Sequence, residues 1–322
     1  MAQDIGEIIA GLYKKYKDFT GQGKVADYIP TLKSVNPQQY AISVATVDGN
    51  RYNIGDYTVG FSIQSISKVF TLAMVAPHLG NDLWNHVGRE PSGNSFNSLV
   101  QLENERGIPR NPFINAGALV ITDKLLTLCK NNIFGPDSNP EISVRAKAKE
   151  YILQFVRELC GYGGVGYDMV TAQAEIITAD RNYALAHFMK SFNNIDNPIN
   201  DVINTYCHHC SIKMSTEQLA AAFLFLANGG VNPIDGREII GKRNAKRINA
   251  LMLTCGMYNE SGDFAYRVGL PGKSGVGGGI VAVIPGKLSI AVWSPELNVN
   301  GNSYRGIATL EDFTTELGIS VF

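Results

Sequence analysis

The sequence has few cysteines, almost no net charge and no long hydrophobic run. Five cysteines among 322 residues are a low and odd number, which disfavours a disulfide framework and favours free thiols in a reducing cytoplasm. The formal net charge of −1, with charged residues at 18%, gives no electrostatic attraction to nucleic acid or to an anionic membrane. No apolar stretch reaches the roughly 18 residues that a membrane-spanning helix needs.

The first residues also lack the pattern of an export signal. Residues 1–5 (MAQDI) form neither a basic n-region nor an apolar h-region. We therefore expect a cytoplasmic protein without nucleic-acid or membrane partners. The hydrophobic content of 45% is that of an ordinary globular protein, and the chain is long enough to build a sizeable core.

The most informative motif is a Ser-x-x-Lys step, formed by Ser65 and Lys68 at the start of an apolar helix. A serine hydroxyl is a weak nucleophile at neutral pH and needs a nearby base. A lysine three residues later lies one turn along the same helix face, where its amine can reach the serine oxygen. A free lysine titrates near ~10.4, so it must be buried or lie near another cation to act as this base.

A second basic motif, Lys-Ser-Gly at 273–275, precedes the strand-like run 280–284. Lys273 is a candidate for the neighbouring cation that lowers the pKa of Lys68. Together the two motifs indicate a lysine-activated serine acyl-transfer site, although either motif alone is short enough to arise by accident. Ser67 is an alternative nucleophile, but it lies one residue from Lys68 and points elsewhere on the helix.

The order of predicted elements is helix, hairpin, helical block, hairpin, helix. Apolar periodicity predicts a helix over 3–19, and a turn at 48–50 predicts a hairpin over 40–54. Residues 81–215 show helical patterns and loops without strand alternation. The expected helices there cover 114–130, 143–160, 174–189 and 199–207, with a loop over 131–143. A helix that follows Ser215, a second hairpin over 279–294 and a helix over 303–317 complete the chain.

These elements predict an α+β fold. The two distant hairpins can form one antiparallel sheet, with the terminal helices covering one of its faces. We expect a discontinuous sheet subdomain (1–80 and 216–322) and an inserted helical subdomain (81–215). Because pockets commonly lie at such a seam, we expect the active site there.

The stretch Cys207-His208-His209-Cys210 has the composition of a metal clip. However, no second ligand pair follows at zinc-finger spacing, and the flanking residues have a helical pattern. We therefore predict that these are core or surface side chains, and that the protein uses neither a metal nor an organic cofactor.

Several longer strings resemble the bacterial-type glutaminases of the serine-dependent β-lactamase-like superfamily, and they occur in one order nearly end to end. They are ADYIP (26–30), FSIQSISK (61–68), EPSG (90–93), FNS (96–98), NPFINAGA (111–118), TADRN (178–182), LANGG (226–230), CGMY (255–258), GLPGKSGV (269–276) and WSP (293–295). The segment around 131–143 fits the family less well and is interpreted as an insertion. The resemblance implies a β-lactamase/D,D-peptidase-like fold, hydrolysis of L-glutamine to L-glutamate and ammonia, and a homodimer or homotetramer.

The resemblance also implies a role for each matching residue. Ser65 would be the nucleophile, Lys68 its base, and Tyr258 a proton relay, while the backbone amides of Ser65 and Val276 would bind the oxyanion. Tyr28 would lie close to the substrate. The groups implied to hold the α-amino and α-carboxylate ends of glutamine are Gln64, Asn115, Glu175, Asn182 and Tyr206.

Amide hydrolysis explains these residue types. It needs a nucleophile, a proton for the departing ammonia and donors for the tetrahedral oxyanion. A carboxylate such as Glu175 suits an ammonium group, and Asn or Tyr donors suit a carboxylate.

Each of these residues also has a plainer interpretation. Glu175 and Asn182 are seven residues apart, so on one helix they would share a face that could simply be solvated. Asn115 could cap a helix. Tyr206 and Tyr258 could be core tyrosines, and Tyr28 could be a packing residue in a loop.

Three other functions compete with glutamine hydrolysis. A penicillin-interactive serine hydrolase shares both lysine motifs, but the chain has no Ser-Asp-Asn motif at a suitable distance and no export signal. A non-catalytic glutamine sensor would not need the complete set of Ser65, Lys68 and Tyr258. A glutamine amidotransferase uses a cysteine nucleophile, and none of the five cysteines lies in a glycine-rich nucleophile turn.

Overall fold

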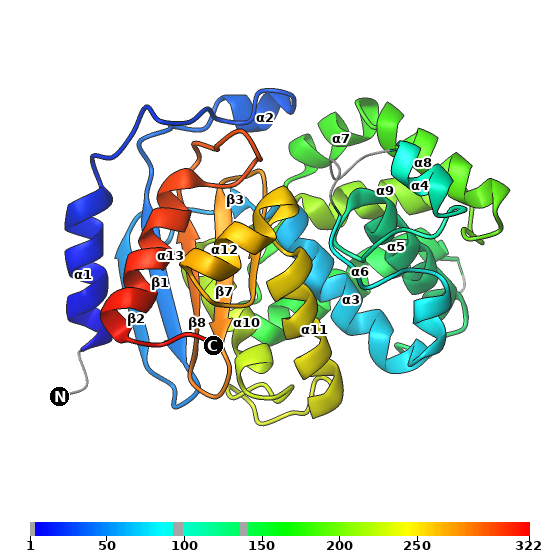
Figure 1. Ribbon diagram of the computed structural model, residues 1–322. Helices are drawn as coiled ribbons and strands as arrows, with labels where there is room; N and C mark the ends of the chain where they lie inside the picture. Colours follow the sequence, from blue (N-terminus) through cyan, green and yellow to red (C-terminus); the bar gives the residue numbers. More distant parts are fainter. Residues whose placement is uncertain (1–3, 93–98, 136–140) are drawn as a thin grey trace.

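The computed structural model describes residues 4–92, 99–135 and 141–322, and a five-stranded antiparallel sheet is its largest β element (Figure 1). The strand order is β2-β1-β8-β7-β6, so the N-terminal hairpin lies beside strands from the end of the chain. This joins the two predicted hairpins into one sheet. The strands are β1 (Ala41–Thr46), β2 (Arg51–Gly55), β6 (Gly272–Ser274), β7 (Gly279–Ile284) and β8 (Leu288–Trp293).

Two terminal helices cover one face of this sheet, as predicted. They are α1 (Ile5–Tyr16) and α13 (Tyr304–Leu317), which pack against each other and against the sheet (Figure 1). Alternate residues of β1 and β8, such as Ile42, Val44 and Ile290, point into this layer and are fully buried. The period of two in the strands therefore determines which side chains reach the terminal helices.

Helix α10 (Thr216–Ala227) packs against the opposite face of the sheet. It begins with a capping box in which Ser215 and Gln218 satisfy each other's backbone amides, as the Ser-x-x-Gln spacing favours. Polar residues on this face of the sheet bond to the helix: the Ser43 hydroxyl lies 2.8 Å from that of Thr216, and Ser289 donates to the Ala220 carbonyl.

Beyond α10 lies a block of helices that shares one apolar core with it (Figure 1). The predicted helices over 114–130, 143–160 and 199–207 are present, the last extending to Cys210. We propose that this block is the inserted subdomain 81–215. Its longer helices, with the one that leads into it, are α3 (Ser67–Leu79), α5 (Asn115–Lys130), α6 (Val144–Cys160), α7 (Met169–Ile177), α8 (Asp180–Ser191) and α9 (Ile199–Cys210).

The predicted helix over 174–189 is wrong as one continuous element. The chain forms α7 and α8 instead, and they are separated by Thr178 and Ala179. Glu175 lies near the end of α7 and Asn182 near the start of α8, so they do not share a face of one helix. The Ala-rich sequence has good helix propensity on both sides of the break, and propensity alone does not reveal it.

Several short elements were not predicted. Three very short strands, β3 (Phe61–Ser62), β5 (Ile212–Met214) and β4 (Gly166–Tyr167), form a second sheet, and strands of this length show no readable alternation. The edge strand β6 of the main sheet was not predicted either. The other unpredicted elements are helices: α2 (Pro30–Lys33), α4 (Leu99–Asn104), α11 (Lys242–Cys255), α12 (Ser261–Arg267) and the 3₁₀ turns η1 (Gln64–Ile66), η2 (Asp82–Asn85) and η3 (Tyr258–Glu260).

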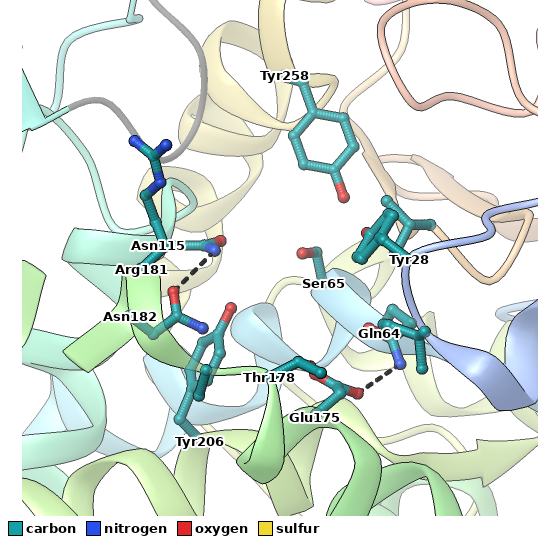
Figure 2. Close-up of a pocket in the computed structure, with 13 residues that line it drawn as sticks. Tyr28, Gln64, Ser65, Asn115, Glu175, Thr178, Arg181, Asn182, Tyr206 and Tyr258 are labelled. Atoms are coloured by element: carbon teal, nitrogen blue, oxygen red, sulfur yellow. Dashed lines mark hydrogen bonds between the residues drawn. The ribbon is translucent and has the colours of Figure 1, made fainter. Parts of the chain in front are cut away.

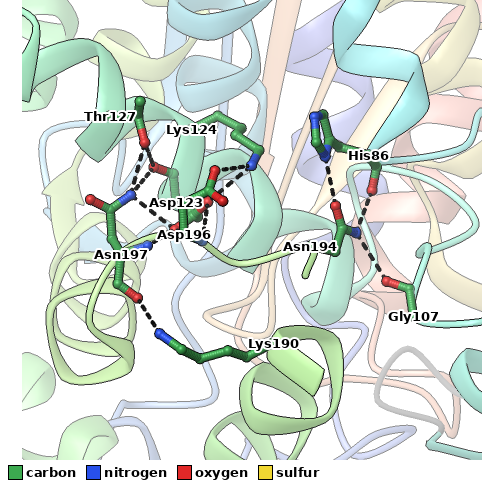
Figure 3. A network of polar contacts seen from close by, with 9 residues as sticks. All are labelled: His86, Gly107, Asp123, Lys124, Thr127, Lys190, Asn194, Asp196 and Asn197. Atoms are coloured by element: carbon green, nitrogen blue, oxygen red, sulfur yellow. Dashed lines mark hydrogen bonds and ion pairs between the residues drawn. The ribbon is translucent and has the colours of Figure 1, made fainter. Parts of the chain in front are cut away.

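A buried polar network ties the connection between α8 and α9 to α5 (Figure 3). The Asp123 carboxylate is fully buried and accepts from the backbone amides of Asp196 (3.1 Å) and Asn197 (2.8 Å). Its other oxygen lies 3.3 Å from the Lys124 amine, which also binds Asp196 at 2.6 Å. Because α5 and α8 each carry a residue of the pocket described below in their first turn, this network helps to fix the distance between two pocket walls.

Two sequence segments lie partly or wholly outside the described residues. The predicted loop 131–143 is described at 131–135 and 141–143, where the chain forms turns and bends. Gly93 and residues 96–98 of the family strings fall outside the described ranges. Among the helices that are described, none combines the length and the apolarity needed to cross a bilayer.

Candidate active site

A cavity of about 330 Å³ opens between the sheet side and the helical block (Figure 2). It lies where η1, α5, α7, α8, α9 and η3 come together, and so at the seam between the two proposed subdomains. The structure places all nine residues predicted to contact substrate in its wall. These are Tyr28, Gln64, Ser65, Asn115, Glu175, Asn182, Tyr206, Tyr258 and Val276.

Ser65 lies in the tight turn η1, which leads directly into α3. Gln64 has a φ of 50°, a left-handed conformation that costs roughly 1–3 kcal/mol for a residue other than glycine. The loop after β6 packs closely behind this turn, because a Cβ at Gly275 would lie 2.3 Å from the Ile63 carbonyl oxygen. The turn is thus held from outside, and Ser65 is left 8% exposed at the cavity wall.

Lys68 lies one turn after Ser65 and is fully buried. Its amine donates to the Asn115 side-chain oxygen at 2.7 Å and to the Phe113 carbonyl at 3.1 Å. Burial lowers the pKa of Lys68 from an ordinary value near 10.5 to about 8, although nearby Cys210 and Glu175 favour the charged form. A substantial fraction of Lys68 is therefore neutral near physiological pH.

Lys273 does not have the effect on Lys68 that the sequence suggested. Burial accounts for the lowered pKa of Lys68. Lys273 itself is fully buried, and burial followed by the charge of Lys68 lowers its own pKa well below the usual value. Its amine donates to the Ser274 carbonyl at 2.7 Å and lies 4.6 Å from the centre of the Tyr258 ring. Lys273 therefore packs against the ring of Tyr258 in this structure.

Tyr258 approaches Ser65 from the opposite side of the cavity (Figure 2). Its φ of 52° is a second left-handed conformation at the site. Burial raises the pKa of Tyr258 to about 12, and hydrogen bonding with the Ser65 and Ser274 side chains opposes this rise. The phenol is thus a neutral proton donor or acceptor whose hydroxyl faces Ser65 (Figure 2).

Glu175 supplies a carboxylate at the floor of the cavity. Its Oε1 accepts from the Gln64 amide at 2.8 Å and from the Ser211 hydroxyl at 3.3 Å. Burial raises the pKa of Glu175 to about 7, while Gln64, Ser211 and the charge of Lys68 oppose the rise. A cationic ligand group would stabilise the ionised form.

Three residues on separate helices form the wall next to Lys68. The Asn115 amide donates to the Asn182 side-chain oxygen at 3.1 Å while its own oxygen accepts from Lys68. Asn115 is the first residue of α5 and makes no side-chain cap, so the interpretation of Asn115 as a helix cap is wrong. The Tyr206 ring is buried and lies 5.8 Å from the Lys68 amine.

Tyr28 and Val276 complete the mouth. Tyr28 is 57% exposed, so it is not a packed loop residue. Val276 is buried with Ile29 and Leu32 in a small apolar cluster at the rim. Within the described part of the chain, the backbone amides of Ser65 and Val276 donate to no other residue.

Sequence reasoning missed Arg181, which also lines the cavity, with its guanidinium group directed away from the Asn182 amide (Figure 2). It also missed Ile29, Thr178 and Ala179 in the wall. Arg181, Thr178 and Ala179 belong to the string 178–182, which was noted for its family resemblance. Because the helix is interrupted between α7 and α8, this string lies in the cavity wall. The continuous helix predicted from the sequence did not indicate this position.

The four residues 207–210 lie in the last turn of α9 and are buried. His209 lies 2.7 Å from the Ser67 hydroxyl and 3.2 Å from that of Thr122. His208 bonds to the Asn204 carbonyl at 2.7 Å. Across residues 4–92, 99–135 and 141–322, no group of three or more His, Cys, Asp or Glu side chains is arranged to hold a metal ion.

Together these groups are suited to acyl transfer. A hydroxyl, a buried amine with a pKa near neutrality and a buried phenol can exchange a proton, and two free backbone amides can receive a developing oxyanion. The single carboxylate and the amides opposite are suited to a small ligand that carries both an ammonium and a carboxylate group.

Comparisons with known proteins agree with this geometry. A family model described as Glutaminase matches residues 23–322. A glutaminase of Sinorhizobium fredii is 51% identical over 320 residues, which are 99% of this chain and 97% of the relative. A solved probable glutaminase, ybaS, has a TM-score of 0.90 at 35% identity, covering 99% of this chain and 98% of its own. A solved Bacillus glutaminase has a TM-score of 0.86 at 32% identity, covering 99% and 100%. The predicted β-lactamase-like α+β fold is thereby confirmed.

Proposed function

The chain belongs to the glutaminase family, and on this premise we propose that it hydrolyses the side-chain amide of L-glutamine through an acyl-enzyme on Ser65. The observation that carries this mechanism is the buried amine of Lys68, whose pKa is about 8, one helical turn from a serine in the cavity wall. Ser65 attacks the amide carbon, and its proton passes to the neutral Lys68 amine.

Collapse of the tetrahedral intermediate releases ammonia and leaves a γ-glutamyl ester on Ser65. The Tyr258 hydroxyl faces Ser65 in the cavity and is the group that relays a proton to the departing nitrogen. A water molecule then attacks the ester with the same base assisting, and glutamate leaves. The amides of Ser65 and Val276 bind the oxyanion in both steps, and losing one such donor typically costs about 10²–10³ in rate.

The two ends of the substrate are held on the helical side. Ionised Glu175 pairs with the α-ammonium group, and Gln64 orients that carboxylate through its 2.8 Å bond. Asn115, Asn182 and Tyr206 provide donors for the α-carboxylate. Arg181 adds a positive charge on the same wall, and Tyr28 covers the mouth.

The competing functions have less support in the structure. A cysteine-dependent amidotransferase requires a reactive thiolate, but all five cysteines are buried, and burial raises the pKa of Cys129 and Cys210 to about 12. Glu175 supplies a carboxylate that can pair with a substrate ammonium group, and a penicillin-interactive enzyme has no need of such a carboxylate. Lys68 supplies a base for a catalytic step, and a sensor that only binds glutamine has no need of such a base.

We further propose a cytoplasmic homodimer or homotetramer. The five free, buried thiols suit a reducing compartment. Light scattering of the purified protein tests the assembly, and a mass near 35.0 kDa, that of one chain, would refute it.

The decisive experiment measures glutamate and ammonia release from L-glutamine by the wild type and by Ser65→Ala. L-Asparagine and nitrocefin serve as parallel substrates. We expect turnover of glutamine that is lost in Ser65→Ala. Turnover of nitrocefin alone would establish the penicillin-type activity, and glutamine binding without product release would establish a sensor.

A further inference from the structure

Ser67 and His209 form a buried polar chain behind the nucleophile that the mechanism above does not use. Both side chains are fully buried. The Ser67 hydroxyl donates to the Gln64 carbonyl at 2.7 Å and lies 2.7 Å from His209 Nδ1. On its far side, His209 Nε2 lies 3.2 Å from the Thr122 hydroxyl. This series of polar side-chain contacts therefore runs from Thr122 on α5 through His209 on α9 to the turn that carries Ser65.

The carbonyl at the end of this chain belongs to an important peptide group. The Gln64 carbonyl and the Ser65 amide are the two ends of one planar peptide unit, and the Ser65 amide is a proposed oxyanion donor. The backbone amide of Ser67 also donates to the Gln64 carbonyl. A donor that pulls electron density toward the carbonyl makes the amide at the other end of the unit a stronger donor.

The same peptide needs mechanical support. Gln64 is held at a φ of 50°, so the turn would relax toward a more common conformation if nothing opposed it. The loop after β6, which contains Gly275 and Gly277, supports the turn on one side. A Cβ at Gly277 would lie 2.1 Å from the Ser62 carbonyl oxygen. The hydroxyl of Ser67 supports it on the other.

We propose that Ser67 and His209 are positioning residues that fix the Gln64–Ser65 peptide and strengthen its amide as an oxyanion donor. The inference rests on the function proposed above. Ser67 is thus not a second nucleophile, since its hydroxyl is committed to a carbonyl away from the cavity.

The direction of the chain follows from counting protons. Burial lowers the pKa of His209 to about 3, so the ring is neutral and carries one N–H. Ser67 gives its only proton to Gln64, and Thr122 gives its own to the Ala118 carbonyl at 2.8 Å, so the single N–H of His209 can bond to only one of the two hydroxyls. The Ser67 contact is the shorter, at 2.7 Å against 3.2 Å, which places the N–H on Nδ1. Nε2 then faces the Thr122 hydroxyl oxygen without a proton between them. The two donors next to the site, His209 Nδ1 and Ser67 Oγ, both point toward the Ser65 peptide.

Kinetics of four variants tests the role. Ser67→Ala removes the donor to Gln64, and His209→Leu removes its support, whereas His209→Asn keeps an N–H at the place of Nδ1. The control is Ser289→Ala, because Ser289 is another fully buried serine that donates to a backbone carbonyl. We expect a fall of roughly tenfold in kcat with an unchanged KM for Ser67→Ala and His209→Leu, and near-normal kcat for His209→Asn and Ser289→Ala.

Nitrogen NMR of wild-type protein labelled in histidine provides a second test that does not depend on activity. The His209 signal should show the Nδ1–H tautomer, and its identity follows from its loss in His209→Asn or His209→Leu. An Nε2–H tautomer would overturn the directed chain. A folded Ser67→Ala enzyme with wild-type kcat would also overturn the proposal while leaving Ser65 as nucleophile, whereas activity in Ser65→Ala would instead refute the proposed function.

Discussion

The activity of the wild-type enzyme should rise steeply with pH between roughly pH 6 and 8, because two groups must lose a proton. Lys68 acts as a base only when its amine is neutral, and its pKa is about 8. Glu175 attracts the substrate ammonium only when it is ionised, and its pKa is about 7. Both pKa values belong to the free enzyme, so kcat/KM is the quantity that reports them.

The magnitude follows from these two values. At pH 7 about one tenth of Lys68 is neutral, compared with roughly one part in three thousand for a lysine at its ordinary pKa. Burial therefore increases the active fraction by about 300-fold at pH 7, which corresponds to about 3 kcal/mol. Well below the pKa of Glu175 both protons are bound, so the logarithm of kcat/KM should rise with a slope near two, changing to one between about pH 7 and 8.

The assay is continuous detection of glutamate from about pH 5.5 to 8.5 at constant ionic strength. Glu175→Gln serves as the matched variant, because it keeps the shape of the side chain and removes its titration. Its acid limb should have a slope near one, and Lys68→Arg, which cannot lose a proton, should be inactive across the range. A wild-type profile that is flat from about pH 6 to 8, or Lys68→Arg activity within tenfold of wild type, would refute the assignment of Lys68 as the base.

Three further predictions concern binding and stability. Glu175→Ala should raise KM by roughly 10- to 100-fold with little change in kcat, because a hydrogen bond to a charged group contributes about 1.5–3 kcal/mol; an unchanged KM would remove Glu175 from the substrate site. Asp123→Ala should lower the free energy of unfolding in urea by about 3–5 kcal/mol, because it leaves buried backbone amides and Lys124 without their acceptor; the exposed Asp196→Asn serves as control, and equal losses in the two variants would contradict the role of the network. Burial raises the pKa of Cys129 from 9.0 to about 12, so its contribution to stability is complete below about pH 9 and is lost as pH rises toward 12. Cys129→Val should therefore lose less stability than wild type between about pH 8 and 10, and parallel losses would contradict this.

The sequence was sufficient to predict strands β1, β2, β7 and β8 of the main sheet and its covering helices, but not the edge strand β6. The hairpins at 40–54 and 279–294 have strong turns and β-branched runs, and α1 and α13 have clear apolar stripes, so local pattern and tertiary contact agree. The second sheet was not predictable, because β3, β4 and β5 are two or three residues long and are stabilised by neighbours far away in the sequence.

The break between α7 and α8 shows a different limit. No proline or glycine marks it, since the break consists of Thr178 and Ala179. It results from how α7 and α8 each pack against α9, which no short-range signal encodes. The position of Arg181 in the cavity wall depends on this break. The family resemblance identified Asn182 as a site residue, but no pattern in the sequence indicated where the neighbouring Arg181 would lie.

Burial at the seam explains why the same cavity can both bind and react. Removing Lys68 from water disfavours its charge and lowers its pKa, and removing Glu175 from water disfavours its charge and raises its pKa. The two values thereby approach neutral pH from opposite directions. A bound ammonium group compensates Glu175 and restores its negative charge, whereas Lys68 is bonded to the neutral oxygens of Asn115 and Phe113. Those acceptors leave the amine free to deprotonate, and replacing Asn115 by a carboxylate would hold Lys68 in its inactive, charged form.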